Sequence, residues 1–327
     1  MKGRHEIEIR NNRCVYKLAF ERNLSVITGA SATGKTTLVN LIRNYDQYGS
    51  SSGISVRCDK RCMVLDNNAW KLVLENTHDS IIFIDEGRGF ISTPEFASAV
   101  KNSDNYCVII TRENLFNLPI SVEAIYGLYG RKYFNLKKIY NSLYRIYPEQ
   151  TQLSPTTRII TEDSNSGFQF FNEMLRNSGA KCVSAGGNSN LLSLIRKFQD
   201  ESVLVIADGA AFGPYMEMLT DYQLKSGNSL TLYVPESFEW LILSSGVVPD
   251  SEISKILEAP FDYIESSQYF SWERFFTALL VEKTNNTYLQ YNKSVLNRSY
   301  LQEHEKQMIL AVLPKGILPP DDKADSA

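Results

Sequence analysis

A run of small residues that ends in lysine and threonine is the first group whose spacing could do chemistry. The stretch GASATGKTT fits the pattern G-x-x-x-x-G-K-[ST], with its glycines at Gly29 and Gly34. Glycines let such a loop turn its main-chain N–H groups toward anionic oxygens, and Lys35 can reach the β- and γ-phosphates of a nucleotide. The Thr36 hydroxyl is a ligand for Mg²⁺. The residues expected to surround the phosphates are Gly29, Ala30, Ser31, Ala32, Thr33, Gly34, Lys35, Thr36 and Thr37.

Two adjacent acids complete this expected site. The stretch IIFIDE is a continuous apolar run that ends in Asp85 and Glu86, a pattern typical of a parallel strand buried on both faces. We expect Asp85, at the C-terminal end of the strand, to hold Mg²⁺ through water. Glu86 is expected to orient and deprotonate the attacking water. The two stretches together predict hydrolysis of a Mg²⁺-bound nucleotide, and the alternative for Glu86 is a surface acid beside a metal ligand.

A third stretch, VIITREN, brings a threonine and an arginine to the end of another apolar strand. If that strand lies between the strands of the first two stretches, Thr111 points toward the γ-phosphate and can sense the nucleotide or position water. Arg112 could instead reach across to a neighbouring subunit. The alternative is a capping threonine and a surface arginine. Three basic residues are weaker candidates for the charge that steadies a transition state: Arg88, Arg131 and Lys132.

Acids at the ends of strands recur in the second half of the chain. Glu162 follows the strand-like run RIIT, and Asp208 follows VLVIA. Glu236 and Glu239 come after LTLYVP. Because the C-terminal ends of parallel strands meet at one edge of a sheet, we expect these carboxylates to converge there, where they can bind Mg²⁺ and act on phosphodiesters. The alternative is that they are helix caps and solvated groups.

The elements that must position these residues alternate between strands and helices in both halves, which predicts an α/β fold class. Residues 1–147 predict an opening hairpin and a parallel sheet, with a last strand and an amphipathic helix over residues 124–147. Prolines and polar residues at 148–157 mark a linker. Residues 158–314 predict a second, smaller α/β domain with C-terminal helices, and residues 315–327 a disordered tail.

The composition limits the classes of protein to which the chain can belong. Hydrophobic residues make up 43 % and charged residues 22 % of the 327 residues, which fits a globular protein with two cores. No window approaches the ~18 uninterrupted apolar residues of a membrane span, so we expect a cytoplasmic protein that makes no membrane contact. The five scattered cysteines favour buried thiols over a zinc site. Basic residues are in excess through Pro148 and acids beyond it, without the dense Lys/Arg stripe of a nucleic-acid-binding surface.

Residues 1–147 resemble P-loop ATPases with an additional catalytic glutamate, the class that contains the AAA+ and ABC-type ATPases. GASATGKTT and IIFIDE stand at the two motifs of that class, and the opening hairpin is most similar to the ABC and RecF-like branch. No LSGGQ-type signature is present, and about fifty residues separate Lys35 from Asp85, which leaves no room for a helical subdomain. The resemblance implies ATP and Mg²⁺ as ligands. A small-molecule kinase is an alternative, but Glu86 directly after Asp85 favours water as the acceptor.

Residues 157–245 resemble the TOPRIM fold of OLD-type nucleases and related defence ATPases. The shared features are a strand-end glutamate, a GG-x-x-N turn, a strand-end aspartate and a later E-x-x-x-L segment. The resemblance implies that Glu162 is a general base and Asp208 a metal ligand. Glu236 or Glu239 would be a further ligand.

The acidic set of that resemblance is incomplete in this chain. Ala210 and Ser166 stand where the family has acids, and Asp163 stands where it has a glycine. A two-metal site that lacks a ligand is a poor clamp on the attacking and leaving oxygens. The resemblance therefore extends to the fold more readily than to the chemistry.

Three functions follow as hypotheses. The first is an ATPase whose nucleotide state controls a TOPRIM-like domain that acts on nucleic acid. The second is an ATP-gated, Mg²⁺-dependent nuclease, which requires Glu162 and Asp208 to share one pocket. The third is a regulatory or scaffold protein that binds nucleotide without hydrolysing it. The partner is a nucleic acid or another protein, and a homo-oligomer is an open alternative.

Overall fold

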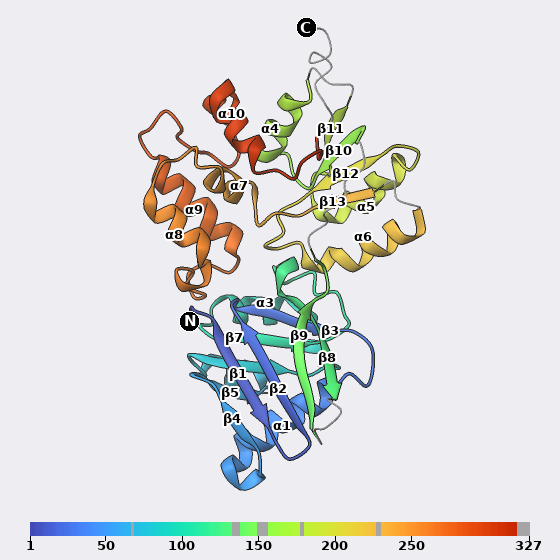
Figure 1. Ribbon diagram of the computed structural model, residues 1–327, viewed down its shortest axis with the longest axis vertical. Coiled ribbons are helices and arrows are strands. Elements are labelled where there is room, and N and C mark those ends of the chain that lie inside the picture. The colour runs from blue at the N-terminus through green and yellow to red at the C-terminus, as the bar shows by residue number, and fades with distance from the viewer. Residues whose placement is uncertain (67–68, 133–137, 149–155, 177–179, 227–229, 319–327) are drawn as a thin grey trace. The chain divides into compact units, whose positions relative to one another are not determined.

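The chain folds into two compact units, drawn as ribbons in Figure 1. The first comprises Met1–Pro148 and Ala259–Ser271, and the second comprises Glu149–Glu258 and Trp272–Ala327. The chain thus returns to the first unit after it has entered the second. The computed structural model describes residues 1–66, 69–132, 138–148, 156–176, 180–226 and 230–318.

A mixed sheet forms the frame of the first unit. Within the described residues it is nine-stranded, in the order β4-β1-β2-β9-β8-β3-β7-β6-β5. The strands are β1 (His5–Arg10), β2 (Cys14–Phe20), β3 (Leu24–Thr28), β4 (Ser55–Arg57), β5 (Arg61–Val64), β6 (Ser80–Ile84), β7 (Tyr106–Ile110), β8 (Ile125–Lys132) and β9 (Ile139–Arg145). The run β8-β3-β7-β6-β5 is parallel, as the sequence predicts. The sheet as a whole is not, because β1–β2, β1–β4 and β8–β9 pair antiparallel.

Two clusters of buried side chains cover opposite faces of the parallel strands. On β6, Ile81 and Phe83 belong to one cluster, whereas Ile82 and Ile84 belong to the other. The first cluster also contains the apolar side of α1 (Lys35–Tyr48) and inward side chains of β1 and β2. Helix α1 is thereby packed between the parallel strands and the antiparallel end of the sheet, which curls over it (Figure 1). The second cluster is covered by α2 (Trp70–Glu75) and α3 (Pro94–Lys101).

The prediction of an amphipathic helix near the end of residues 124–147 is wrong, because strand β9 lies there. It pairs with β8 from Tyr126–Arg145 to Lys132–Ile139. Two glycines of β8 make room for this pairing. A Cβ added at Gly127 would lie 2.2 Å from the Tyr144 ring, and one added at Gly130 would lie 2.7 Å from the Asn141 side chain. Pairing with a strand that precedes it, and not the local pattern, therefore decides the conformation of this segment.

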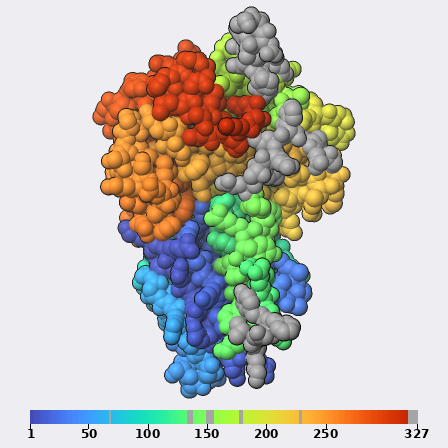
Figure 2. Space-filling view, in the orientation of Figure 1, coloured from blue at the N-terminus to red at the C-terminus, as the bar shows by residue number. Residues whose placement is uncertain are grey.

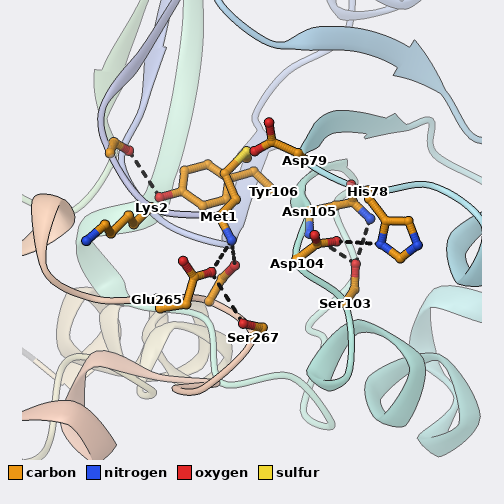
Figure 3. A network of polar contacts seen from close by, with 12 residues as sticks. Met1, Lys2, His78, Asp79, Ser103, Asp104, Asn105, Tyr106, Glu265 and Ser267 are labelled. Carbon is orange, nitrogen blue, oxygen red and sulfur yellow. Dashed lines mark hydrogen bonds and ion pairs between the residues drawn. The ribbon is translucent and has the colours of Figure 1, made fainter.

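The segment Ala259–Ser271 is hydrogen-bonded to the start of the chain (Figure 3). The Gly3 N–H donates to the Phe261 carbonyl at 2.7 Å, and the Met1 ammonium donates to the Ser266 hydroxyl at 2.9 Å and pairs with Glu265. Farther along, the Asn23 side chain donates to the Phe270 carbonyl at 3.2 Å. These contacts are long-range, so the sequence pattern does not reveal that the segment belongs to the first unit.

The second unit contains a four-stranded, all-parallel sheet in the order β11-β10-β12-β13 within the described residues. Its strands are β10 (Arg158–Thr161), β11 (Lys181–Ser184), β12 (Val203–Ile206) and β13 (Leu230–Tyr233), as the alternating pattern predicts. Its helices are α4 (Ser166–Met174), α5 (Asn188–Lys197), α6 (Gly213–Ser226), α7 (Phe238–Ser244), α8 (Ser251–Glu258), α9 (Trp272–Thr284) and α10 (Glu303–Ala311). Helices α8, α9 and α10, orange to red in Figures 1 and 2, gather on one side of this unit, away from α5 and α6.

Two predicted segments lie at least partly outside the described residues. The linker predicted at 148–157 falls outside them from 149 to 155, and the tail predicted at 315–327 from 319 onward. Of the helices that the structure describes, none combines the length and the apolar character needed to span a membrane.

Candidate functional site

Residues 29–34 join β3 to α1 in a loop whose conformation depends on glycine. Gly29 and Gly34 have φ angles of 114° and 98°, which side chains with a Cβ rarely adopt. Ala32, with a φ of 64°, shares this strain. A Cβ added at Gly34 would also lie 2.9 Å from the hydroxyl oxygen of Tyr16. The loop therefore wraps tightly in front of the first turn of α1, where main-chain N–H groups are free to meet an anion.

The Lys35 side chain hydrogen-bonds to carbonyl groups of this loop. Its side chain is 6 % exposed, and its Nζ donates to the carbonyl oxygens of Gly29 at 2.8 Å and Ala30 at 2.7 Å. Burial lowers the pKa of Lys35 and so does nearby Arg112, whereas Glu86 raises it. These neutral carbonyls are weaker partners for an ammonium than a phosphate oxygen would be. Lys35 is thus held where it can turn from the loop to a phosphate.

Tyr16 lies on strand β2, at the antiparallel end of the sheet, and contacts the end of the loop. Its ring is buried, and its hydroxyl donates to the Gly34 carbonyl at 3.0 Å. Burial raises the pKa of Tyr16, although a hydrogen bond with Thr37 lowers it. Asn141 of β9 stands beside it, and its side chain donates to the Val15 carbonyl at 3.3 Å. The curl of the sheet therefore fixes the point at which the loop meets α1.

The acids and the threonine predicted from the sequence lie along the same edge as the loop. Strand β7 lies between β3 and β6, which is the arrangement assumed for Thr111. Asp85 and Glu86 follow β6, and Thr111 follows β7. Thr111 is buried, its N–H donates to the Ile27 carbonyl, and its hydroxyl accepts the Glu113 N–H at 3.0 Å. The carboxyl ends of these parallel strands bring residues from three separate stretches to one place.

Arg112 links two parts of this edge within one chain. Its Nη2 donates to the Ser31 hydroxyl at 2.7 Å, and its Nε lies 3.9 Å from Glu86 Oε2. Both ends of the pair are exposed, so its net contribution to stability is small. These contacts position the Arg112 guanidinium between the loop and Glu86, the acid expected to activate water.

The weaker basic candidates lie in other surroundings. Arg88 donates to Asp66 Oδ1 at 3.0 Å, and Arg43 binds the same carboxylate through Nε and Nη2, at 2.8 Å for Nη2. The guanidinium of Arg43 lowers the pKa of Asp66 against the effect of burial. Arg131 lies 5.6 Å from the centroid of the Tyr129 ring on β8, where the following Lys132 is also exposed.

The donors at this edge fit an anionic nucleotide with a divalent ion. The N-terminus of α1, the loop N–H groups and Lys35 supply positive potential for phosphates. Thr36 is exposed in the first turn of α1, and Asp85 is half-buried at the end of β6, so both oxygens are accessible for Mg²⁺. No family model matches the chain, and no curated protein matches its sequence.

A second candidate site is a cavity of about 40 Å³ in the second unit. Glu162 follows β10 and Asp208 comes two residues after β12, and these two strands are parallel neighbours in register from Arg158–Val203 to Thr161–Ile206. Both side chains line the cavity, together with Glu239 in the first turn of α7. Of the four acids expected to converge, these three line one cavity. Glu236 lies outside the cavity lining, and its carbonyl accepts the Ala210 N–H at 3.1 Å.

Two further charged residues, Lys293 and Glu273, lie beside these acids, and the sequence did not indicate either of them. Lys293 lies with its Nζ 3.8 Å from Asp208 Oδ2 and 3.8 Å from Glu239 Oε1, and it forms an ion pair with Glu273 of α9. Neither residue stands in a recognisable motif. Among the residues that the structure describes, no group of three or more His, Cys, Asp or Glu is arranged to hold a metal ion.

Two acids of this pocket, Glu162 and Asp208, have pKa values raised above their ordinary ones. Burial raises the pKa of Glu162 to about 7, and the charges of Glu273 and Asp163 act in the same direction. Burial and then Glu162 raise the pKa of Asp208 well above its usual value. Within the described residues, Glu162 Oε2 and Glu239 Oε2 are buried without a hydrogen-bond partner. Two buried carboxylate oxygens of the pocket are thus left without a hydrogen-bond partner, and burial favours the protonated form of Glu162 and Asp208.

Replacing Tyr16 with Phe tests the support behind the loop. Loss of one buried hydroxyl hydrogen bond should lower the free energy of unfolding by about 1 kcal/mol. The control Tyr129→Phe changes an exposed tyrosine of β8 and should have almost no effect. Urea denaturation of the full chain measures both, and equal losses in the two variants would contradict the role given to Tyr16.

The pKa of Glu162 predicts how stability depends on pH. Its folded-state value of about 7 lies above the ordinary 4.5, so the folded state holds the proton more tightly than the unfolded chain. Stability should therefore fall as the pH rises from 4.5 to 7, by up to about 3 kcal/mol, and Glu162→Gln should remove that part of the fall. Denaturation in EDTA across this range measures it. Parallel pH profiles for the two proteins would show that Glu162 titrates normally.

Proposed function

We propose that the first unit binds Mg-ATP at the 29–37 loop and hydrolyses it, as a P-loop ATPase with an additional catalytic glutamate. The observation that carries the proposal is the strand order β8-β3-β7-β6-β5, with the loop after β3, the acid pair after β6 and Thr111 after β7. This order gives the loop, the acids and the threonine a common edge. Arg112, between Ser31 and Glu86, supports the same assignment.

In this proposal each residue has one task. Lys35 exchanges the carbonyls of Gly29 and Ala30 for phosphate oxygens, and the loop N–H groups hold the remaining oxygens. A bound Mg²⁺ would neutralise phosphate charge, with Thr36 and Asp85 as its expected protein partners. Glu86 accepts a proton from the attacking water. Arg112, released from Ser31, donates to the oxygens on which charge develops.

The second unit is proposed as a TOPRIM-like output module that acts on nucleic acid under the control of the nucleotide state. Nuclease activity is a second candidate, because Glu162 and Asp208 line one cavity, as that activity requires. The absence of acids at Ala210 and Ser166 weighs against it. A regulator that binds nucleotide without turnover is the third candidate, and a Glu86 variant separates it from the first two.

Replacing Glu86 with Gln removes the proposed base but keeps the size of the side chain. The rate of ATP hydrolysis should fall by about 10²- to 10⁴-fold, because the general base is lost. Affinity for Mg-ATP should stay within a few-fold, because the loop is unchanged. Phosphate release and binding of a fluorescent ATP analogue measure the two quantities.

The matched control is Glu113→Gln, which changes an exposed acid two residues after Thr111. It should hydrolyse ATP at the rate of the unchanged protein. Equal, measurable rates for the unchanged protein and Glu86→Gln would contradict the role of Glu86. Binding without measurable hydrolysis in either protein would favour the non-hydrolysing regulator.

The contacts of Arg112 predict that it acts on the nucleotide of its own chain. Arg112→Ala should lower hydrolysis by about 10²-fold or more, as expected for loss of a transition-state arginine. Mixing it with Glu86→Gln subunits should restore no activity, because each chain then lacks one essential group. Recovery of activity in the mixture would show that the arginine serves a neighbouring subunit.

A further inference from the structure

Lys293 lies at the point on which the carboxylates of the second unit converge. Its Nζ meets Asp208 and Glu239 at 3.8 Å each, and the third partner is Glu273. These acids come from the end of β12, from α7 and from α9, so the fold, and not one local motif, brings them around the ammonium. An ammonium is a compact charge, and it takes the place that a small cation would occupy among the same oxygens.

The surrounding loop fixes where Lys293 stands. Its carbonyl accepts the N–H of Ser166, the first residue of α4, at 2.8 Å. Gln169 of the same helix donates to the Ser294 carbonyl at 2.8 Å and accepts the Leu296 N–H at 2.9 Å. The loop is thus tied to α4 at the lysine and just after it. The Lys293 side chain therefore enters the pocket from an anchored backbone.

Tyr291 adds a second tie between this loop and the acids. Its hydroxyl donates to Glu239 Oε1 at 2.8 Å and hydrogen-bonds with the Ser166 hydroxyl at 2.6 Å. Glu239 lines the cavity and its side chain is only 1 % exposed, and in the described part of the chain its buried Oε2 has no hydrogen-bond partner. A buried, unpaired carboxylate oxygen attracts a cation. The pocket is therefore built for positive charge, and the chain supplies one positive charge itself.

We infer that Lys293 is a resident cation that excludes divalent metal ions from the acidic pocket of the second unit. Mg²⁺ and Mn²⁺ need direct oxygen ligands, and an ammonium among the same carboxylates both repels the ion and holds the oxygens away from it. This inference stands independently of whether the first unit hydrolyses ATP.

The test is Mn²⁺ binding to the full chain without nucleotide, in an Asp85→Asn background that disables the first unit's expected metal ligand. The lysine-containing protein should bind Mn²⁺ only weakly. Lys293→Met, which keeps an unbranched side chain one atom shorter and removes its charge, should bind one Mn²⁺ at least tenfold more tightly. Its melting temperature should fall without the metal and recover when Mn²⁺ is added. Isothermal titration calorimetry and thermal denaturation measure these effects.

Lys283→Met is the matched control, because Lys283 also bridges two acids, Asp250 and Glu252, outside the cavity. It should gain no Mn²⁺ affinity. Adding Asp208→Asn to Lys293→Met should remove the gain and so locate the ion. Equal Mn²⁺ affinity with and without Lys293 would overturn the inference.

If Lys293→Met does not fold, a charge-compensated variant keeps the inference testable. Lys293→Met combined with Glu273→Gln removes one positive and one negative charge, and Asp208 and Glu239 stay in place. This protein should fold and bind Mn²⁺ more tightly than its lysine-containing parent. A folded double variant whose Mn²⁺ affinity is unchanged would overturn the inference, because the lysine would then not be the barrier.

Discussion

Compensation of charge at the carboxyl ends of parallel strands is the constraint on which both candidate sites depend. The parallel strands of each sheet deliver charged side chains to one edge, and burial makes unpaired charge costly there, above all in the second unit. In the first unit Glu86 is balanced by Arg112, and Lys35 is satisfied by loop carbonyls. These contacts are polar and replaceable. In the proposed function, a nucleotide and its metal ion would replace these partners.

The second unit meets the same constraint in the opposite way. Lys293 lies among Asp208, Glu239 and Glu273, and its backbone is tied to α4. Burial disfavours the charged lysine, but Glu239, Asp208 and Glu273 outweigh it, so the pKa of Lys293 is raised. The protein thus fills this pocket with a charge of its own. The two units therefore differ in burial: the first pairs exposed charged groups at its edge, whereas the second places a lysine among more deeply buried acids.

The sequence predicted those parts of the sites whose residues lie close together along the chain. The eight positions from Gly29 to Thr36 carry the loop in one stretch, and the apolar runs before Asp85 and Asp208 mark strands buried in a parallel sheet. The parts it missed depend on pairing between distant segments. Tyr16 reaches the loop only because the sheet curls, and Lys293 reaches Asp208 only because its loop is tied to α4. Strand β9 was missed for the same reason, since its partners are β8 and β2.

We expect the chain to bind a divalent ion in the first unit together with nucleotide, and to bind none in the second. The number of Mn²⁺ ions bound per chain can be counted by titration followed with electron paramagnetic resonance, with and without a non-hydrolysable ATP analogue. One tightly bound Mn²⁺ should require the analogue, and no ion should bind tightly without it. Tight Mn²⁺ binding in the absence of nucleotide, or no ion gained with the analogue, would show that the metal is not distributed in this way.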